Sequence, residues 1–120
     1  MTIDTHHISQ RFDKELDAVK SQLTEMGGIV EQQVRDAIQA LLEVDSELAE
    51  RVVKNDRAIN KMEVRIDESC ALILARRQPA AGDLRLVLTI IKIITDLERV
   101  GDEADNCLLY TSDAADDTRS

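Results

Sequence analysis

The segment from Leu84 to Val100 constrains the fold most, because aliphatic residues occupy nearly every side of the helix that it predicts. A helix that is apolar on most of its circumference is buried on most sides. Two neighbouring helices cannot cover it completely, so we expect a further layer, either a second copy of the bundle or a dimer partner. The aliphatic positions are Leu84, Leu86, Val87, Leu88, Ile90, Ile91, Ile93, Ile94, Leu97 and Val100.

Two longer periodic runs precede this segment and predict two amphipathic helices. The first repeats apolar residues at spacings of four and three from Phe12 to Leu41, with Ser9 placed to cap its start. Gly27-Gly28 interrupts the run without shifting its phase, so we predict one helix with a kink or a close helix approach at the glycines. The second run extends from Leu48 to Ile73, after a break at Asp45-Ser46 that offers an N-cap.

The second helix combines an apolar stripe with a charged outer face. Asn55 and Ser69 interrupt the stripe, and Cys70 lies beside Ser69, where we expect it to pack in the core. Pro79 ends this helix near residue 78, and Asp83 is available to cap the third. The predicted helices therefore cover residues 9–44, 46–78 and 83–106. The outer face of the second helix is predicted to carry mixed charges: Glu50, Arg51, Lys54, Asp56, Arg57, Lys61, Glu63 and Arg65.

The composition favours an all-α fold. Aromatic residues make up only 2% of the 120 residues, and there are one proline and four glycines, too few for the turns of a β-protein. Helix-forming residues dominate instead. Short connections join antiparallel neighbours, so we predict an antiparallel three-helix bundle with long helices, preceded by a flexible N-terminus at residues 1–8.

The formal charge of −9 argues against two classes of partner. Nucleic acid requires a basic face to neutralise phosphates, and an anionic leaflet repels an acidic surface. The polar start MTIDTHHISQRFDKEL predicts no secretory signal, and the most apolar segment is too short to span a bilayer. Two cysteines at unrelated positions predict neither a disulfide nor a zinc site. We therefore expect a cytoplasmic protein that meets the membrane only through its partners.

The character of the chain changes at Cys107. The string CLLYTSDAADD loses the apolar periodicity, and it matches the in-frame translation of a transposon-end sequencing adapter. We interpret residues 107–120 as a non-native tail, with a genuine acidic extension as the alternative. The native coding sequence in this chain is then expected to stop at about Asn106. The uninterrupted genomic reading frame is expected to continue past this point into a second helical repeat.

The third helix ends in the acidic sequence DLERVGDEADN. Helical spacing places Glu98 and Asp102 on one stripe with either Asp105 or Asn106. Like charges at this spacing repel one another unless they are solvated or neutralised by cations. Oxygen ligands suit Mg²⁺, Mn²⁺, Ca²⁺ or carboxylate-bridged iron. An ordinary solvated acidic surface is the alternative, but these residues directly continue the most buried helix, which favours a metal site.

No catalytic apparatus is visible in the sequence. His6 and His7 precede the first predicted helix, and no histidine falls on any helix, so histidine phosphotransfer and a ferritin-like Glu-x-x-His centre are not supported. The chain has no glycine-rich phosphate loop and no nucleophile elbow. We therefore expect a protein that is not an enzyme.

Several motifs in a fixed order resemble the PhoU family. They are MGGIVEQQVRDAI, then RQP, DLR and DLERVGD, within a similarity that covers about residues 6–106. The resemblance implies the first of two tandem three-helix repeats and a non-enzymatic negative regulator of phosphate uptake and of the phosphate-starvation response. It implies a homodimer that bridges the ATPase subunit of the phosphate ABC transporter and a phosphate sensor histidine kinase.

The resemblance also assigns a role to the acidic motif. The family pattern of an acid, three residues and an aspartate matches Glu98 and Asp102, and it is associated with multinuclear sites for iron, zinc, manganese or magnesium. Asp105 and Asn106 stand where the family often has polar residues. The second repeat carries its own copy of the motif, so a shared cluster in this chain would lack about half its ligands.

Three other functions compete with this interpretation. The helical stripes are equally typical of a purely structural dimerising bundle. The acidic motif would also suit a metal-binding helical protein unrelated to phosphate signalling. A metal-dependent hydrolase or phosphotransferase is disfavoured, because no nucleophile or base accompanies the acids.

Overall fold

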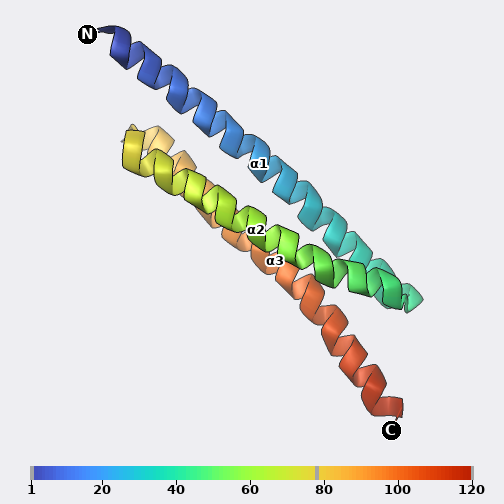
Figure 1. The fold of residues 1–120 in the computed structure, drawn as a ribbon. Helices are drawn as coiled ribbons and strands as arrows, with labels where there is room; N and C mark the ends of the chain where they lie inside the picture. Colours follow the sequence, from blue (N-terminus) through green and yellow to red (C-terminus); the bar gives the residue numbers. More distant parts are fainter. Residues whose placement is uncertain (1, 78, 120) are drawn as a thin grey trace.

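The chain folds into three long antiparallel helices, α1 (Thr2–Glu43), α2 (Ser46–Arg77) and α3 (Ala81–Arg119), as Figure 1 shows. The computed structural model describes the backbone of residues 2–77 and 79–119, and the side chains of residues 10–76 and 79–109. These residues contain no strand, and the helices form a rod of 75 × 18 × 17 Å. The predicted all-α three-helix bundle is confirmed.

The core runs along the axis of the rod and takes residues from every helix. The apolar positions that recur at spacings of three and four face this axis, so each stripe buries its side chains against the other two helices. Complete burial of one such side chain contributes about 1.5–3 kcal/mol to the free energy of unfolding. The main cluster consists of Phe12, Leu16, Val19, Met26, Val30, Ile59, Ile66, Cys70, Ile73, Val87, Ile90 and Ile94.

Helix α1 is continuous through its two central glycines, as predicted. The predicted close approach there is wrong, because a Cβ atom added at Gly27 or Gly28 would meet nothing within 4 Å. The helix begins at Thr2 and not near Ser9. It therefore includes the backbone of His6 and His7, whose side chains lie outside the described residues.

Helix α3 also differs from its predicted bounds. It begins at Ala81, before Asp83, and it remains helical to Arg119, beyond the predicted end at Asn106. Leu108 is buried in a second cluster against α1 and α2. Its burial follows from helical phase, because it comes three residues after the buried Asp105. The interpretation of residues 107–120 as a non-native tail stays a prediction.

The aliphatic surface of α3 is larger than α1 and α2 can cover, as its sequence predicts. Val87, Ile90 and Ile94 are buried, whereas Leu88 and Val100 remain 50% and 47% exposed. What covers these exposed side chains in the complete assembly stays a prediction. Across the part of the chain that the structure describes, every helix is too short in its apolar segments, or too polar, to cross a membrane.

In α2, the structure confirms the predicted burial of Cys70 but not the predicted place of Asn55 in the buried stripe. Cys70 is fully buried in the core, and burial, together with the nearby carboxylate of Asp67, raises the pKa of its thiol. Asn55, predicted to interrupt the buried stripe, is exposed. Its place on the inner face is taken by Asp56.

A strained residue joins α1 to α2. Val44 has a positive φ of 52°, a left-handed conformation in which a β-branched side chain is unfavourable. The backbone N–H of Asp45 donates a hydrogen bond to the carbonyl of Ala40 at 3.1 Å, which is the bond of a Schellman motif. The side chain of Asp45 then accepts a hydrogen bond from the N–H of Leu48 at 3.1 Å and caps α2. The predicted N-cap at this break is therefore confirmed.

Val44→Gly is expected to stabilise the bundle, because glycine adopts a positive φ without the steric penalty of a β-branched side chain. The left-handed conformation costs about 1–2 kcal/mol, and the flexibility of glycine in the unfolded chain offsets part of this, so we expect a gain of about 0.5–1 kcal/mol. Chemical denaturation measures it. Leu42→Gly in the last turn of α1 is the matched control and should lose about 1 kcal/mol. A loss of stability in Val44→Gly would contradict the strain.

Candidate metal centre

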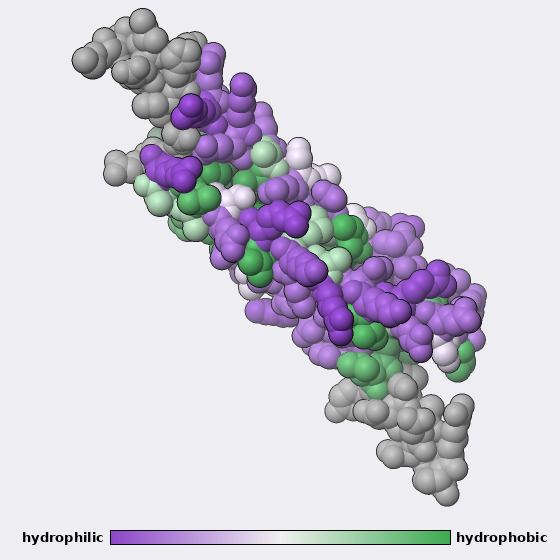
Figure 2. Space-filling view, viewed as in Figure 1, coloured by the Kyte–Doolittle hydropathy of each residue, from purple (hydrophilic) through white to green (hydrophobic). Residues whose placement is uncertain are grey.

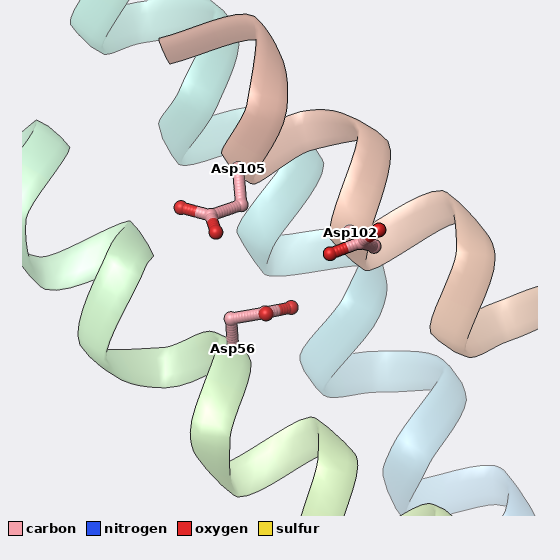
Figure 3. A group of neighbouring side chains, drawn as sticks. All are labelled: Asp56, Asp102 and Asp105. Carbon is pink, nitrogen blue, oxygen red and sulfur yellow. The ribbon is translucent and has the colours of Figure 1, made fainter. Parts of the chain in front are cut away.

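Three aspartates from two helices converge at the seam between α2 and α3. Asp56 comes from α2, and Asp102 and Asp105 come from successive turns of α3. Figure 3 shows the three side chains directed toward one another from the two helices. One carboxylate oxygen of each residue lies within 4.8 Å of those of the other two. Asp56 and Asp105 are each only 9% exposed, whereas Asp102 is open to solvent.

A glutamine from α1 and a glycine from α3 position this group. Gln33 is buried, and its Nε2 donates to the carbonyl oxygen of Gly101 at 3.2 Å and to Oδ1 of Asp56 at 3.5 Å, the longer contact being the weaker. A Cβ atom at Gly101 would lie 3.2 Å from Cδ1 of Ile59, tighter than most real contacts. The absent side chain therefore allows α3 to approach α2 closely where the aspartates meet.

Burial and the nearby carboxylates make the charged forms of Asp56 and Asp105 less favourable. Burial raises the pKa of Asp56, the carboxylate of Asp102 raises it further, and the amide of Gln33 partly opposes the shift. Burial likewise raises the pKa of Asp105, with additional contributions from Asp56 and Asp102. Oδ1 of Asp105 is buried and has no hydrogen-bond partner. Among the described residues, no lysine or arginine forms an ion pair with the three aspartates.

Further acidic residues line the seam from this group toward the end of the rod where α2 and α3 are connected. Burial raises the pKa of Glu98, the carboxylates of Asp102 and Asp56 raise it further, and the neighbouring Arg99 lowers it. On α2, burial raises the pKa of Glu63, with contributions from Glu98 and Asp67. Both glutamates are half-buried. Negative charge is therefore concentrated along the α2–α3 seam.

The donor set fits a hard cation. Mg²⁺ and Mn²⁺ prefer oxygen ligands, and carboxylates also bind iron. Oδ1 of Asp105, buried without a partner, supplies an oxygen that a cation would satisfy. Zn²⁺ fits less well, because its protein sites usually include histidine or cysteine and this group offers neither.

The structure brings together only part of the residues that the sequence singled out. Asp102 and Asp105 belong to the converging group, while Glu98 lies one turn before it and outside the 4.8 Å limit. Asn106 is exposed and lies about 100° around the helix from Asp105. Whether these four residues bind metal stays a prediction.

Sequence reasoning missed two residues of the site. Asp56 was placed on the outer face of α2, although it follows Val52 by four residues and precedes Ile59 by three, which is the spacing of the buried stripe. Gln33 has the same relation to buried residues of α1, three after Val30 and four before Ala37. A polar residue at a core spacing was therefore the available signal in both cases.

Asp105→Asn should stabilise the metal-free protein at pH 7 by on the order of 1 kcal/mol, because it removes one of three crowded negative charges and keeps the shape of the side chain. A shift of this size raises Tm by about 4 °C or more, measurable by thermal unfolding in EDTA.

The raised pKa of Asp105 means that the folded state takes up protons first as the pH falls. The stability of the wild type should therefore rise toward acidic pH, and the advantage of the variant should shrink.

Glu103→Gln, which removes an exposed acid from the same helix, is the control and should change the stability by less than about 0.5 kcal/mol. If Asp105→Asn were less stable than the wild type at pH 7 in EDTA, the three carboxylates would not repel one another as the geometry indicates.

A search of protein-family models matches residues 23–111 to the PhoU domain. A PhoU homologue of Pseudomonas putida, named a phosphate-specific transport system accessory protein, is 61% identical over 100 residues, which are 83% of this chain and 39% of that protein. The accessory protein PhoU of Escherichia coli strain K12 is 54% identical over 99 residues, which are 82% of this chain and 41% of that protein. The chain thus spans about two-fifths of the length of these relatives.

Solved structures show the same fold. The crystal structure of PhoU from Pseudomonas aeruginosa superposes with a TM-score of 0.79 at 56% identity, over 81% of this chain and 46% of that one. The phosphate transport system regulatory protein PhoU from Streptococcus pneumoniae gives a TM-score of 0.75 at 35% identity, with the same coverage of both chains.

Proposed function

Because this chain belongs to the PhoU family, we propose that it is a binding module that represses phosphate uptake and the phosphate-starvation response. It acts in the cytoplasm, between the ATPase subunit of the phosphate ABC transporter and the phosphate sensor histidine kinase. The relatives are named accessory or regulatory proteins of phosphate transport, which supports this role. They are about twice as long, so the activity of the whole protein comes to this chain as a proposal.

The surface of the rod supports binding of proteins. All three helices expose large aliphatic side chains, and Ile38 on α1 and Leu88 on α3 are among those that are about half exposed. Exposed aliphatic side chains contribute to contacts with other proteins where they lie together in one patch, whereas single ones are ordinary. The acidic group offers carboxylates only, without an accompanying histidine or thiol, so we propose a binding role and not catalysis.

We also propose that Asp56, Asp102 and Asp105 hold a metal ion, with iron, manganese or magnesium favoured over zinc. The observation that carries this proposal is the convergence of three carboxylates within 4.8 Å with one buried oxygen left without a partner. Glu98 is near enough to the group for Asp102 and Asp56 to raise its pKa, and we include it in the proposed site. Asn106, one helical turn after Asp102, is a further proposed ligand. When bound, the metal supplies the positive charge that offsets the repulsion between the acids.

A purely structural dimerising bundle is the main alternative. The exposed aliphatic side chains of α3, including Leu88 and Val100, would then cover one another across a homodimer. A metal-binding helical protein unrelated to phosphate signalling is a second alternative, which rests on the same three aspartates.

Addition of Mn²⁺ at neutral pH should raise the Tm of the wild-type chain, because a ligand that binds only the folded state stabilises it by mass action. At one hundred times its Kd, the gain is about 2.7 kcal/mol. The triple variant Asp56→Asn, Asp102→Asn, Asp105→Asn should lose this gain, while Glu103→Gln should keep it. Mg²⁺, Fe²⁺ and Zn²⁺ in parallel rank the ions. An equal shift in the wild type and the triple variant would contradict the site.

A pull-down with purified transporter ATPase subunit and sensor histidine kinase tests the regulatory role. We expect the chain to retain both proteins. Retention of neither partner, together with stable dimers in sedimentation, would favour the structural alternative.

A further inference from the structure

We propose that the outer face of α2 is a docking surface for an acidic amphipathic helix of a partner protein. Four exposed bases at spacings of three, four and four place their side chains on one side of this helix. This side is turned away from the core. We call these residues the basic stripe: Lys54, Arg57, Lys61 and Arg65.

The charges of α2 are segregated around the helix. The sequence predicted an outer face of mixed charge, but the core turns Asp56 and Glu63 inward to the seam with α3, where they are buried and half-buried. Glu50 and Glu68 remain on the outer side, before and after the stripe. Between them, the exposed charges are positive except for Asp67, which lies close enough to Glu63 to raise the pKa of that residue, in a chain whose formal charge is −9.

Among the residues whose side chains the structure describes, no ion pair to a base of the stripe is found. The ion pairs found among the described residues with a lysine or an arginine are Arg35 with Glu31 and Lys92 with Asp96, and both lie on other helices. An unpaired row of bases attracts carboxylates over a Debye length of about 8 Å at physiological salt. The stripe is therefore complementary to an acidic surface.

Apolar side chains on the same side indicate that the occupant is amphipathic. Val64 is 55% exposed between two bases of the stripe, and Leu72 is 50% exposed two turns further along. Figure 2, in which α2 lies in front as in Figure 1, shows strongly hydrophilic side chains interspersed with hydrophobic ones along this part of the rod. A shallow depression of about 400 Å³ is lined by Asn60, Lys61, Val64, Arg65 and Glu68.

The dimensions favour a protein helix over a membrane or a nucleic acid. The stripe from Lys54 to Arg65 is about 16 Å long and one helix wide, which matches three turns of a second helix with acids at the same spacing. A bilayer or a duplex would extend beyond the stripe and meet the acidic α2–α3 seam. A short acidic helix experiences mainly the local positive charge, because salt screens the rest.

This inference rests on the proposed binding role and is independent of the metal. The aspartates of the metal centre lie on the seam and the stripe lies on the outer face. Loss of one surface therefore leaves the other intact.

Fluorescence anisotropy of a labelled synthetic peptide tests the proposal. The probe is a 20-residue amphipathic helix with glutamates at spacings of three and four and leucines beside them, and its counterpart with lysine in place of glutamate is the peptide control. The full chain should bind the acidic probe and not the basic one, and the affinity should fall as the salt concentration rises. Reversal of the stripe, as Lys54→Glu, Arg57→Glu, Lys61→Glu and Arg65→Glu, should weaken binding at least about tenfold.

A charge-matched variant reverses four bases elsewhere on the rod. It should bind like the wild type, and circular dichroism should show the same helix content in both variants. The substitutions are Arg11→Glu, Lys14→Glu, Lys20→Glu and Arg85→Glu.

Three results would overturn the proposal. One is failure of the full chain to bind the acidic probe at low salt, and another is equal loss of binding in the two variants, which would reflect net charge alone. The third is tighter binding of phosphatidylglycerol vesicles or of duplex DNA than of the peptide, which would assign the face to a lipid surface or a nucleic acid. If the ATPase and the kinase bind the stripe-reversed protein undiminished while the peptide does not, the regulatory role stands and their contacts lie elsewhere.

Discussion

Burial of three aliphatic stripes against one shared axis is the constraint on which the rest of the structure depends. Once Val52 and Ile59 face this axis, the phase of α2 is set, and every other side chain of the helix takes its direction from them. Asp56, which shares their spacing, is carried inward with them. The cost of its burial is tolerated because the aliphatic contacts along the rod outweigh it.

The same phase explains why the charges of α2 separate into two surfaces. The inward turn of Asp56 and Glu63 brings them to the acids of α3 and creates a seam of carboxylates that only protons or cations can neutralise. The bases that remain outside form a positive row. One packing constraint thus produces two surfaces of opposite charge on a rod 17–18 Å across. We propose the first as a metal site and the second as a docking surface for an acidic helix.

The sequence predicted only part of the acidic site. Asp102 and Asp105 were predicted because they lie close together on a single helix, where spacing alone indicates proximity. Asp56 and Gln33 come from other helices, and their proximity depends on how α1 and α2 pack against α3. The glycines illustrate the same difficulty. Gly27-Gly28 stands out in the sequence as a pair, but a Cβ atom added at either would meet nothing within 4 Å, whereas the single Gly101 allows the close approach at the site.

The sequence by itself determined the number of helices, their order, the break and cap at Asp45, and the excess of aliphatic surface on α3. These features follow from local spacing and composition, which act within a few turns of one chain segment. Only the tertiary structure decided which acids meet across the seam and which face of α2 is basic. Those outcomes depend on the rotation of each helix about its own axis, which is set by contacts between residues far apart in the sequence.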